Sequence, residues 1–365
     1  MAPSLNSSKS LHDFVVRDGN GVKGLVDLGL SEVPEMYIQP PEERIKKEES
    51  KSWDVPPIDL SKLNGAEHEK VVDEIVRAAE TLGFFQVVNH GVPLELWESL
   101  KDAANTFFSL PRENKAVYLT GVSRSAKVKY GTSFTPHKEK ILEWRDYISL
   151  TYSSDEDALQ CWPNQLKEVA LEYLKLSSKI VRDIMEILIT KLGVELDDSK
   201  IEGLIGIKKV NMVYYPPCPN PELTVGIGRH SDIGIITVLL QDDIGGLYVK
   251  VESENDAEKG EWLEIPPTPG VLVINIGNTL EILSNGKYKS AEHRARPSST
   301  QTRVSAAVFT MPTATETIGP FLEVVKNDGL ARYKDLVFKD YMDHVFGNVH
   351  DGRNSLDFAR INSPN

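Results

Sequence analysis

The sequence is poor in cysteine, in long apolar stretches and in positive charge, and each absence excludes a class of protein. Its two cysteines, Cys161 and Cys218, are too few for a disulfide framework and fit a reducing compartment. No run of about 18 apolar residues predicts a membrane span, and the N-terminus lacks the apolar core of a secretory signal. A net charge of −13 argues against a nucleic-acid partner. We therefore expect a cytoplasmic monomer with neither membrane nor nucleic-acid partners.

The spacing of apolar residues changes along the 365 residues. Apolar residues recur at helical spacing over 66–82, 96–110 and 165–192, whereas after about residue 205 short strand-like runs alternate with Gly, Pro and Asn turns. Many short strands at nearly regular spacing predict a β-sandwich or barrel. The expected parts are an irregular N-terminal arm (1–54), a helical region (55–200), a β core (205–315) and a C-terminal helical segment with its tail (316–365).

A candidate metal site begins with the tripeptide His230-Ser231-Asp232. Residues i and i+2 of a strand project from one face, so the imidazole and the carboxylate can converge on one ion. His293 follows after enough chain for several antiparallel strands and can return beside the pair. Two histidines and one carboxylate that leave open positions are the facial triad of non-haem Fe(II) oxygenases. An H-x-D pair also occurs by chance, so the prediction depends on further features.

Ten residues after His293, the run RVSAAVFTM provides such a feature. Arg303 and Ser305 lie on one strand face, where a guanidinium can pair bidentately with a carboxylate and a hydroxyl can add a hydrogen bond. These groups fit the distal carboxylate of 2-oxoglutarate, with Tyr215 as a candidate third donor. A surface or ion-paired arginine is the ordinary alternative for Arg303.

In this order and spacing, His230, Asp232, His293 and the Arg303–Ser305 pair resemble the plant 2-oxoglutarate/Fe(II)-dependent dioxygenases. The resemblance covers residues 55–361 and includes the runs GFFQVVNHGV, NMVYYPPCPNPEL and PPTPGVLVINIGNTLEILSNGKYKSAEHR. It implies a mainly β fold, a double-stranded β-helix (jelly-roll) core with flanking α-helices, that uses Fe(II) and 2-oxoglutarate, with ascorbate as a reductant in vitro. Within the family, FVVRDGNGVKGLVDLGLSEVP and KYGTSFTPHKEKILEWRDYISL resemble the scopoletin 8-hydroxylase and feruloyl-CoA ortho-hydroxylase group.

Two positions depart from the family pattern. Val213 stands where Asn commonly precedes the paired tyrosines, and Asn278 replaces the acid of the usual V-N-I-G-D. The first change removes a polar group expected near the co-substrate, and the second keeps size and hydrogen bonding but loses charge. They bear on efficiency and substrate more than on the reaction class, because neither is expected to touch iron.

The resemblance implies an enzyme that uses O2 to hydroxylate a phenolic small molecule, with succinate and CO2 as co-products. An intact Asp232 favours hydroxylation, because family halogenases carry a small residue there. Phe309 shares a strand face with Arg303 and can stack on an aromatic ring. Phe134 and Trp144 are weaker candidates, and a core position is an equal alternative for Trp144.

Three functions stay open at this point. Hydroxylation of a coumarin ring, giving a catechol, is the first. Ortho-hydroxylation of a hydroxycinnamoyl-CoA is the second, and it requires cations for the CoA phosphates. Four lysines around YGTSF are candidates for that role, although solvated surface lysines are the ordinary interpretation; they are Lys127, Lys129, Lys138 and Lys140. A non-catalytic ligand-binding relative is the third.

Overall fold

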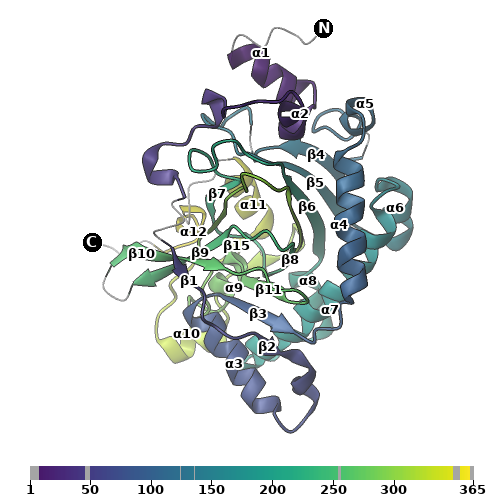
Figure 1. Cartoon of the computed structure of the whole chain (residues 1–365). Helices are drawn as coiled ribbons and strands as arrows, with labels where there is room; N and C mark the ends of the chain where they lie inside the picture. Colours follow the sequence, from purple (N-terminus) through teal and green to yellow (C-terminus); the bar gives the residue numbers. More distant parts are fainter. Residues whose placement is uncertain are drawn as a thin grey trace.

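Two β-sheets with a cavity between them form the centre of the computed structural model, which describes residues 8–45, 50–123, 125–134, 136–253, 256–347 and 354–361. Strands of both sheets line the cavity, and helices cover the outside (Figure 1). This arrangement confirms the predicted mainly β fold with flanking helices.

The larger sheet has eight strands, and its central strands are buried on both faces. β8 and β11 therefore have nearly continuous apolar sequences, ITVLLQ and LVINI, instead of an alternating pattern. In spatial order the strands are β2 (Ile58–Asp59), β3 (Phe84–Val88), β11 (Leu272–Ile276), β8 (Ile236–Gln241), β13 (Arg303–Met311), β6 (Ile207–Tyr215), β5 (Asp146–Tyr152) and β4 (Val128–Thr132).

The smaller sheet has five strands and supplies both histidines of the candidate metal site. Its order is β1 (Lys51–Ser52), β10 (Asp256–Ile265), β9 (Leu247–Ser253), β12 (His293–Ala295) and β7 (Ile227–His230). A separate pair, β14 (Thr317–Ile318) and β15 (Leu336–Val337), lies in the C-terminal region. The four-part division of the chain stays a prediction. The larger sheet takes strands from both 55–200 and 205–315.

Three helices pack on the outer face of the larger sheet and confirm the helical periodicity of the sequence. They are α3 (His68–Thr81), α4 (Leu94–Phe108) and α7 (Lys167–Lys191). Val72, Ile75 and Ala79 of α3 are buried along one stripe, as the spacing predicts. The shorter helices are α5 (Arg112–Ala116), α6 (Asp155–Cys161), α8 (Asp198–Leu204), α9 (Asn278–Leu283), α10 (Leu322–Asp328), α11 (Phe338–Gly347) and α12 (Asn354–Asp357).

The N-terminal arm was predicted to be irregular, but its described part contains helices. It contains α1 (Ser8–His12), a π-helical turn (Asp13–Arg17) and α2 (Gly21–Asp27). Val15, Val22 and Leu25 are buried in a small apolar cluster that also contains Trp144. Apolar spacing in so short a segment is a weak signal, and the helices owe their stability to this tertiary contact.

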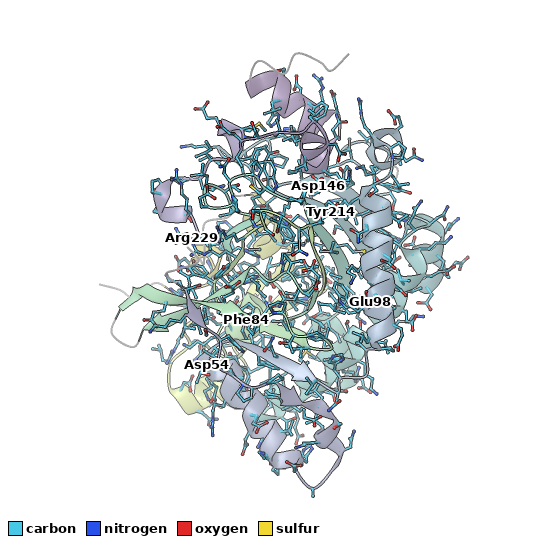
Figure 2. The ribbon with its side chains drawn as sticks, in the orientation of Figure 1. Asp54, Phe84, Glu98, Asp146, Tyr214 and Arg229 are labelled. Atoms are coloured by element: carbon cyan, nitrogen blue, oxygen red, sulfur yellow. The ribbon has the colours of Figure 1, made fainter. Side chains whose placement is uncertain are left out.

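One carboxylate anchors the arm to the larger sheet. Asp146 of β5 accepts hydrogen bonds from the backbone N–H groups of Val22 (2.7 Å) and Lys23 (2.9 Å), in the first turn of α2. Figure 2 labels Asp146 close to this part of the arm. The buried carboxylate satisfies amide groups that a helix N-terminus leaves without intrahelical partners.

Candidate metal centre and co-substrate site

His230 and His293 are directly opposite each other on the antiparallel strands β7 and β12. Their ring centroids lie 4.1 Å apart. Each Nδ1 lies near the backbone oxygen two residues earlier, that of Gly228 at 2.9 Å and that of Ala291 at 3.2 Å. A carbonyl only accepts, so both Nδ1 atoms donate, and in the neutral ring each Nε2 can coordinate a metal ion.

Asp232 completes the group, but not in the way the strand period predicts. β7 ends at His230, so Asp232 lies in the following loop and not two positions along a strand. Its Oδ1 is nevertheless 3.7 Å from each of the two histidine Nε2 atoms. Ligand atoms of all three residues lie within 4.8 Å of one another. Two imidazoles and one carboxylate oxygen are the donor set that non-haem Fe(II) requires.

Two neighbours of Asp232 determine which of its oxygens faces the histidines. Thr237 of β8 and Asn275 of β11 donate hydrogen bonds to Oδ2 at 2.6 Å and 2.7 Å. Burial raises the pKa of this carboxyl, but the two histidines and these hydrogen bonds outweigh it and lower the pKa below its usual value. Sequence reasoning missed both neighbours, although Asn275 lies in the I-N-I-G-N run.

The loop that carries Asp232 is held against the start of α9. The backbone N–H of Asn278 donates to the carbonyl oxygen of Asp232 at 2.6 Å. The approach requires glycine at 277, because a Cβ there would lie 2.2 Å from the carbonyl oxygen of Gly234. Asn278 does not line the cavity; its side-chain amide donates to Tyr341 Oη (3.1 Å) and Ser355 Oγ (3.0 Å).

Arg303 is a buried cation in the same cavity, only 1% exposed. Its Nε donates to the carbonyl oxygen of Gly245 (2.7 Å), and Nη2 donates to Gln241 Oε1 (3.2 Å). Among the described residues, no carboxylate forms an ion pair with it. Asp242 interacts with the guanidinium electrostatically without forming an ion pair. A buried guanidinium whose hydrogen bonds go to neutral groups favours an anionic ligand, as the carboxylate clamp predicts.

The other two residues of the predicted clamp lie beside Arg303. Nη1 of Arg303 donates to Ser305 Oγ at 3.3 Å, and the guanidinium carbon lies 4.8 Å from the ring centroid of Tyr215, its cross-strand partner. Burial raises the pKa of Tyr215, so its hydroxyl stays a donor. Val213 is opposite Ser305 and lines the same cavity. The apolar replacement therefore does lie close to the candidate co-substrate site.

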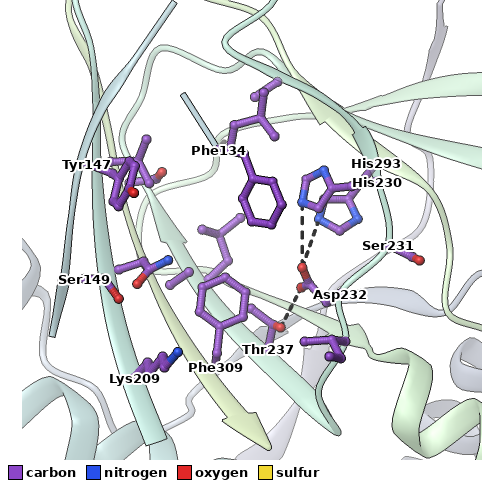
Figure 3. Close-up of a pocket in the computed structure, with 18 of the residues that line it drawn as sticks. Phe134, Tyr147, Ser149, Lys209, His230, Ser231, Asp232, Thr237, His293 and Phe309 are labelled. Carbon is purple, nitrogen blue, oxygen red and sulfur yellow. Dashed lines mark hydrogen bonds and ion pairs between the residues drawn. The ribbon is translucent and has the colours of Figure 1, made fainter. Parts of the chain in front are cut away.

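The cavity measures about 760 Å³ and contains both predicted phenylalanines. Figure 3 shows Phe134 and Phe309 directed into the space that His230, Asp232 and His293 border. Trp144 does not line it; this residue is fully buried under the arm, with its Nε1–H donating to Pro216 O, so the prediction of a substrate contact was wrong.

Of the four candidate lysines, only Lys129 lines the cavity, at an exposed position. Lys127 pairs with Asp157 at 2.8 Å, and Lys138 donates to the carbonyl oxygen of Gly347 at 2.6 Å. Several cavity residues were not predicted from the sequence, among them Phe84 of β3, which lies edge-on to His293 at 5.1 Å, Lys209 of β6, and His344 and Phe346 of α11. Phe84 lies in the run GFFQVVNHGV, whose resemblance to the family assigned it no site role, and the other three come from segments without a motif.

Two family models match the chain. The 2OG-Fe(II) oxygenase superfamily matches residues 208–312, and the N-terminal region described as non-haem dioxygenase in morphine synthesis matches residues 55–168. Scopoletin 8-hydroxylase of Arabidopsis thaliana is 56% identical over 361 residues, which is 99% of each chain. A feruloyl CoA ortho-hydroxylase of Ipomoea batatas is 47% identical over 99% of this chain and 100% of its own.

Solved structures agree with these matches. The crystal structure of JOX2 in complex with 2OG, Fe and JA has a TM-score of 0.79 at 31% identity, covering 93% of this chain and 97% of that one. A rice dioxygenase for auxin oxidation shares the fold with a TM-score of 0.70 at 23% identity, covering 84% of this chain and 100% of that one. The two-sheet core is therefore the jelly roll of this family, as the resemblance implied.

The chain belongs to the 2OG-Fe(II) oxygenase superfamily. It is a 2-oxoglutarate-dependent dioxygenase with Fe(II) and 2-oxoglutarate as cofactor and co-substrate. None of the helices in the described part of the chain could span a membrane.

Proposed function

We propose that this dioxygenase hydroxylates the ring of a coumarin of the scopoletin type and gives a catechol coumarin. One observation carries the proposal: the cavity places two phenylalanine side chains, Phe134 and Phe309, beside the candidate metal ligands (Figure 3). A flat aromatic ring between them has an edge directed at His230, Asp232 and His293. The 56% identity to a scopoletin 8-hydroxylase over nearly the full length supports this choice of ring.

In this proposal, His230 and His293 would bind Fe(II) through Nε2, and Asp232 would bind it through Oδ1. The Nδ1–H hydrogen bonds and the two donors on Oδ2 hold each ligand atom in its orientation. The bound metal supplies the activation of O2. One oxygen atom ends in the hydroxylated ring and the other in succinate, while 2-oxoglutarate loses CO2.

The co-substrate 2-oxoglutarate has its own candidate binding residues in the cavity. We assign its distal carboxylate to Arg303, with Ser305 and Tyr215 as further hydrogen-bond donors. Arg303 is fixed before binding by its bonds to Gly245 and Gln241, so little side-chain entropy is lost when the carboxylate binds.

The test supplies iron anaerobically and then offers scopoletin and feruloyl-CoA in parallel, with O2 and 2-oxoglutarate. Succinate is quantified and organic products are identified by mass. Succinate in one-to-one ratio with a scopoletin product heavier by one oxygen atom is the expected result, and Asp232→Ala abolishes it. Succinate coupled to neither compound above the substrate-free rate contradicts the proposal.

A second candidate, ortho-hydroxylation of feruloyl-CoA, is favoured by one observation. Lys129 is exposed where it lines the cavity, so it can meet a CoA phosphate. Lys127 and Lys138 weaken this candidate because both already have partners in the protein. Succinate coupled to feruloyl-CoA instead of scopoletin would establish it.

We also propose that the enzyme works in the cytoplasm as a monomer, with neither nucleic acid nor membrane as partner. Cys161 and Cys218 are both free thiols, which fits a reducing compartment. Light scattering after size-exclusion chromatography tests the oligomeric state, with a mass near the 40.7 kDa of one chain expected.

A further inference from the structure

The strand that carries His230 is an edge strand with an irregular pairing. β7 is the last strand in the order of the smaller sheet, and it pairs there with β12. His230 is opposite His293 and Ile227 is opposite Ala295, so two residues of β7, of which Gly228 is one, lie opposite one residue of β12. Such a bulge interrupts the ladder of backbone hydrogen bonds. The backbone of Gly228 therefore needs a partner from outside the sheet.

Glu143 is this partner, and it comes from the segment that precedes β5. The backbone N–H of Gly228 donates to Oε1 of Glu143 at 2.8 Å, although the two residues are 85 positions apart in the sequence. The segment runs beside β7, because the backbone N–H of Trp144 donates to the carbonyl oxygen of Val225 at 2.8 Å. A carboxylate is a strong acceptor for a backbone N–H, so this hydrogen bond replaces a missing ladder bond.

Arg145 holds the other oxygen of the same carboxylate. Its Nε and Nη2 lie 2.9 Å and 2.6 Å from Oε2 of Glu143. Both residues are buried, and Arg145 lines the cavity. The carboxylate of Glu143 is thus shared between the guanidinium and the backbone of β7. A buried ion pair of this kind has little freedom to move, because each charge would be costly without the other.

Gly228 connects this ion pair to the candidate metal centre. Its carbonyl oxygen accepts the hydrogen bond of His230 Nδ1 at 2.9 Å. The position of that acceptor determines the tautomer and the orientation of the imidazole, and with them the direction of Nε2. His293 lies on β12, which is paired on both sides, with β7 and with β9. The orientation of His293 therefore depends on the sheet itself and not on Glu143.

We propose that Glu143 is a positioning residue for the candidate iron ligand His230. Its hydrogen bond to Gly228 holds the carbonyl group that orients the imidazole, and Arg145 keeps the carboxylate in place. The inference rests on the proposed function only where that function takes His230 as an iron ligand, and it is independent of the organic substrate.

The test compares Glu143→Met with Glu143→Gln in the full chain. Both variants keep the length of the side chain and remove the charge that pairs with Arg145, but only the amide oxygen of Gln can still accept from Gly228. Dissociation constants for Co(II) are measured anaerobically. We expect Glu143→Met to weaken Co(II) binding roughly 10-fold, and Glu143→Gln less than about 3-fold.

Glu43→Met is the matched control. Glu43 also pairs with a residue of β7, Arg229, at 3.1 Å, but it does so through the side chain of Arg229, so the affinity for Co(II) should not change. Proton NMR of the Co(II)-loaded protein provides a separate readout for each histidine, because the metal ion shifts the signal of each Nδ1–H. Glu143→Met should shift and broaden one of these two signals and leave the other in place.

Equal losses of Co(II) affinity in Glu143→Met and Glu143→Gln would overturn the proposal, because the charge and not the hydrogen bond would then matter. Unchanged affinity in both variants, or equal changes in both histidine signals, would overturn it as well. If neither variant folds, the same pair is compared in an Arg145→Met background, where no buried guanidinium is left without its anion. Metal binding requires no organic substrate, so a failure to hydroxylate scopoletin would contradict the proposed function and leave this inference standing.

Discussion

The side-chain amide of Asn275 donates a hydrogen bond to Oδ2 of Asp232 at 2.7 Å, from a strand 43 residues further along the chain. With Thr237 on the same oxygen, both hydrogen bonds occupy Oδ2 and leave Oδ1 toward the histidines. Oδ1 is therefore the carboxylate oxygen that would bind a metal ion together with the two histidines.

Removal of this support should weaken metal binding. We expect Asn275→Ala, and Thr237→Val to a similar extent, to reduce the affinity for Fe(II) or Co(II) roughly 10-fold to 100-fold. The measurement is an anaerobic metal titration followed by the Co(II) absorption bands. Thr310→Val is the matched control, because this buried threonine donates only to the backbone oxygen of Ile236. A metal affinity that equals that of the control would contradict the role of Oδ2.

Arg303 should determine the affinity for 2-oxoglutarate and not that for the organic substrate. We expect Arg303→Gln to raise the KM for 2-oxoglutarate roughly 10-fold to 100-fold, since two or more charge-assisted hydrogen bonds are lost. Arg303→Lys should recover only part of this, because an ammonium lacks the planar fork. Succinate formation at varied 2-oxoglutarate gives the KM. A proportional rise in the KM of the organic substrate would show general damage to the cavity instead.

Asn278 should act on the C-terminal part of the cavity. It donates to Tyr341 and Ser355, in the region whose residues His344, Phe346 and Ser355 line the cavity. We expect Asn278→Ala to destabilise the protein by about 1–3 kcal/mol, to raise the KM of the organic substrate and to leave that of 2-oxoglutarate unchanged.

Hydrogen exchange of α11 is the direct measurement for this variant, and faster exchange there is expected. Asn285→Ala is the control, because Asn285 is equally buried and donates to Asp328 and to the backbone of Leu330. If both variants raise the KM of the organic substrate equally, the effect does not come from the hydrogen bonds of Asn278 to Tyr341 and Ser355.

The contact between Asp146 and the arm should make stability depend on pH. Burial raises the pKa of Asp146 to about 6 in the folded protein, although the amides of Lys23 and Val22 oppose the shift. In the unfolded chain the pKa of this carboxyl is about 4. Between these two pKa values the folded state binds more protons than the unfolded state, so the free energy of unfolding rises as the pH falls. Full protonation of Asp146 raises the free energy of unfolding by roughly 2–3 kcal/mol.

Thermal unfolding of the wild type and Asp146→Asn between pH 7.5 and 4.5 checks this expectation. As the pH falls, the Tm of the wild type should rise relative to that of Asp146→Asn, because the protonated acid resembles the amide. Asp27→Asn makes the same chemical change at an exposed ion-paired site of α2 and should not reproduce the trend. Parallel curves for wild type and Asp146→Asn would refute the shifted pKa.

The sequence by itself determined the reaction class and the outline of the fold. The candidate metal ligands and the candidate anion clamp follow from residue type and order; they are His230, Asp232, His293, Arg303 and Ser305. The helices α3, α4 and α7 were also predictable, because a long amphipathic stripe is a local signal.

The tertiary structure decided what depends on partners distant in the sequence. Asp232 reaches the candidate metal site from a loop rather than a strand, because hydrogen bonds from Asn275, Thr237 and Asn278 hold it there. The arm is helical where it packs against Trp144, and this packing buries Trp144 away from the cavity, so it is no substrate contact. Strand register turned Lys209 into the cavity beside Phe309, and no local pattern marks it, since the register follows from pairing across the whole sheet.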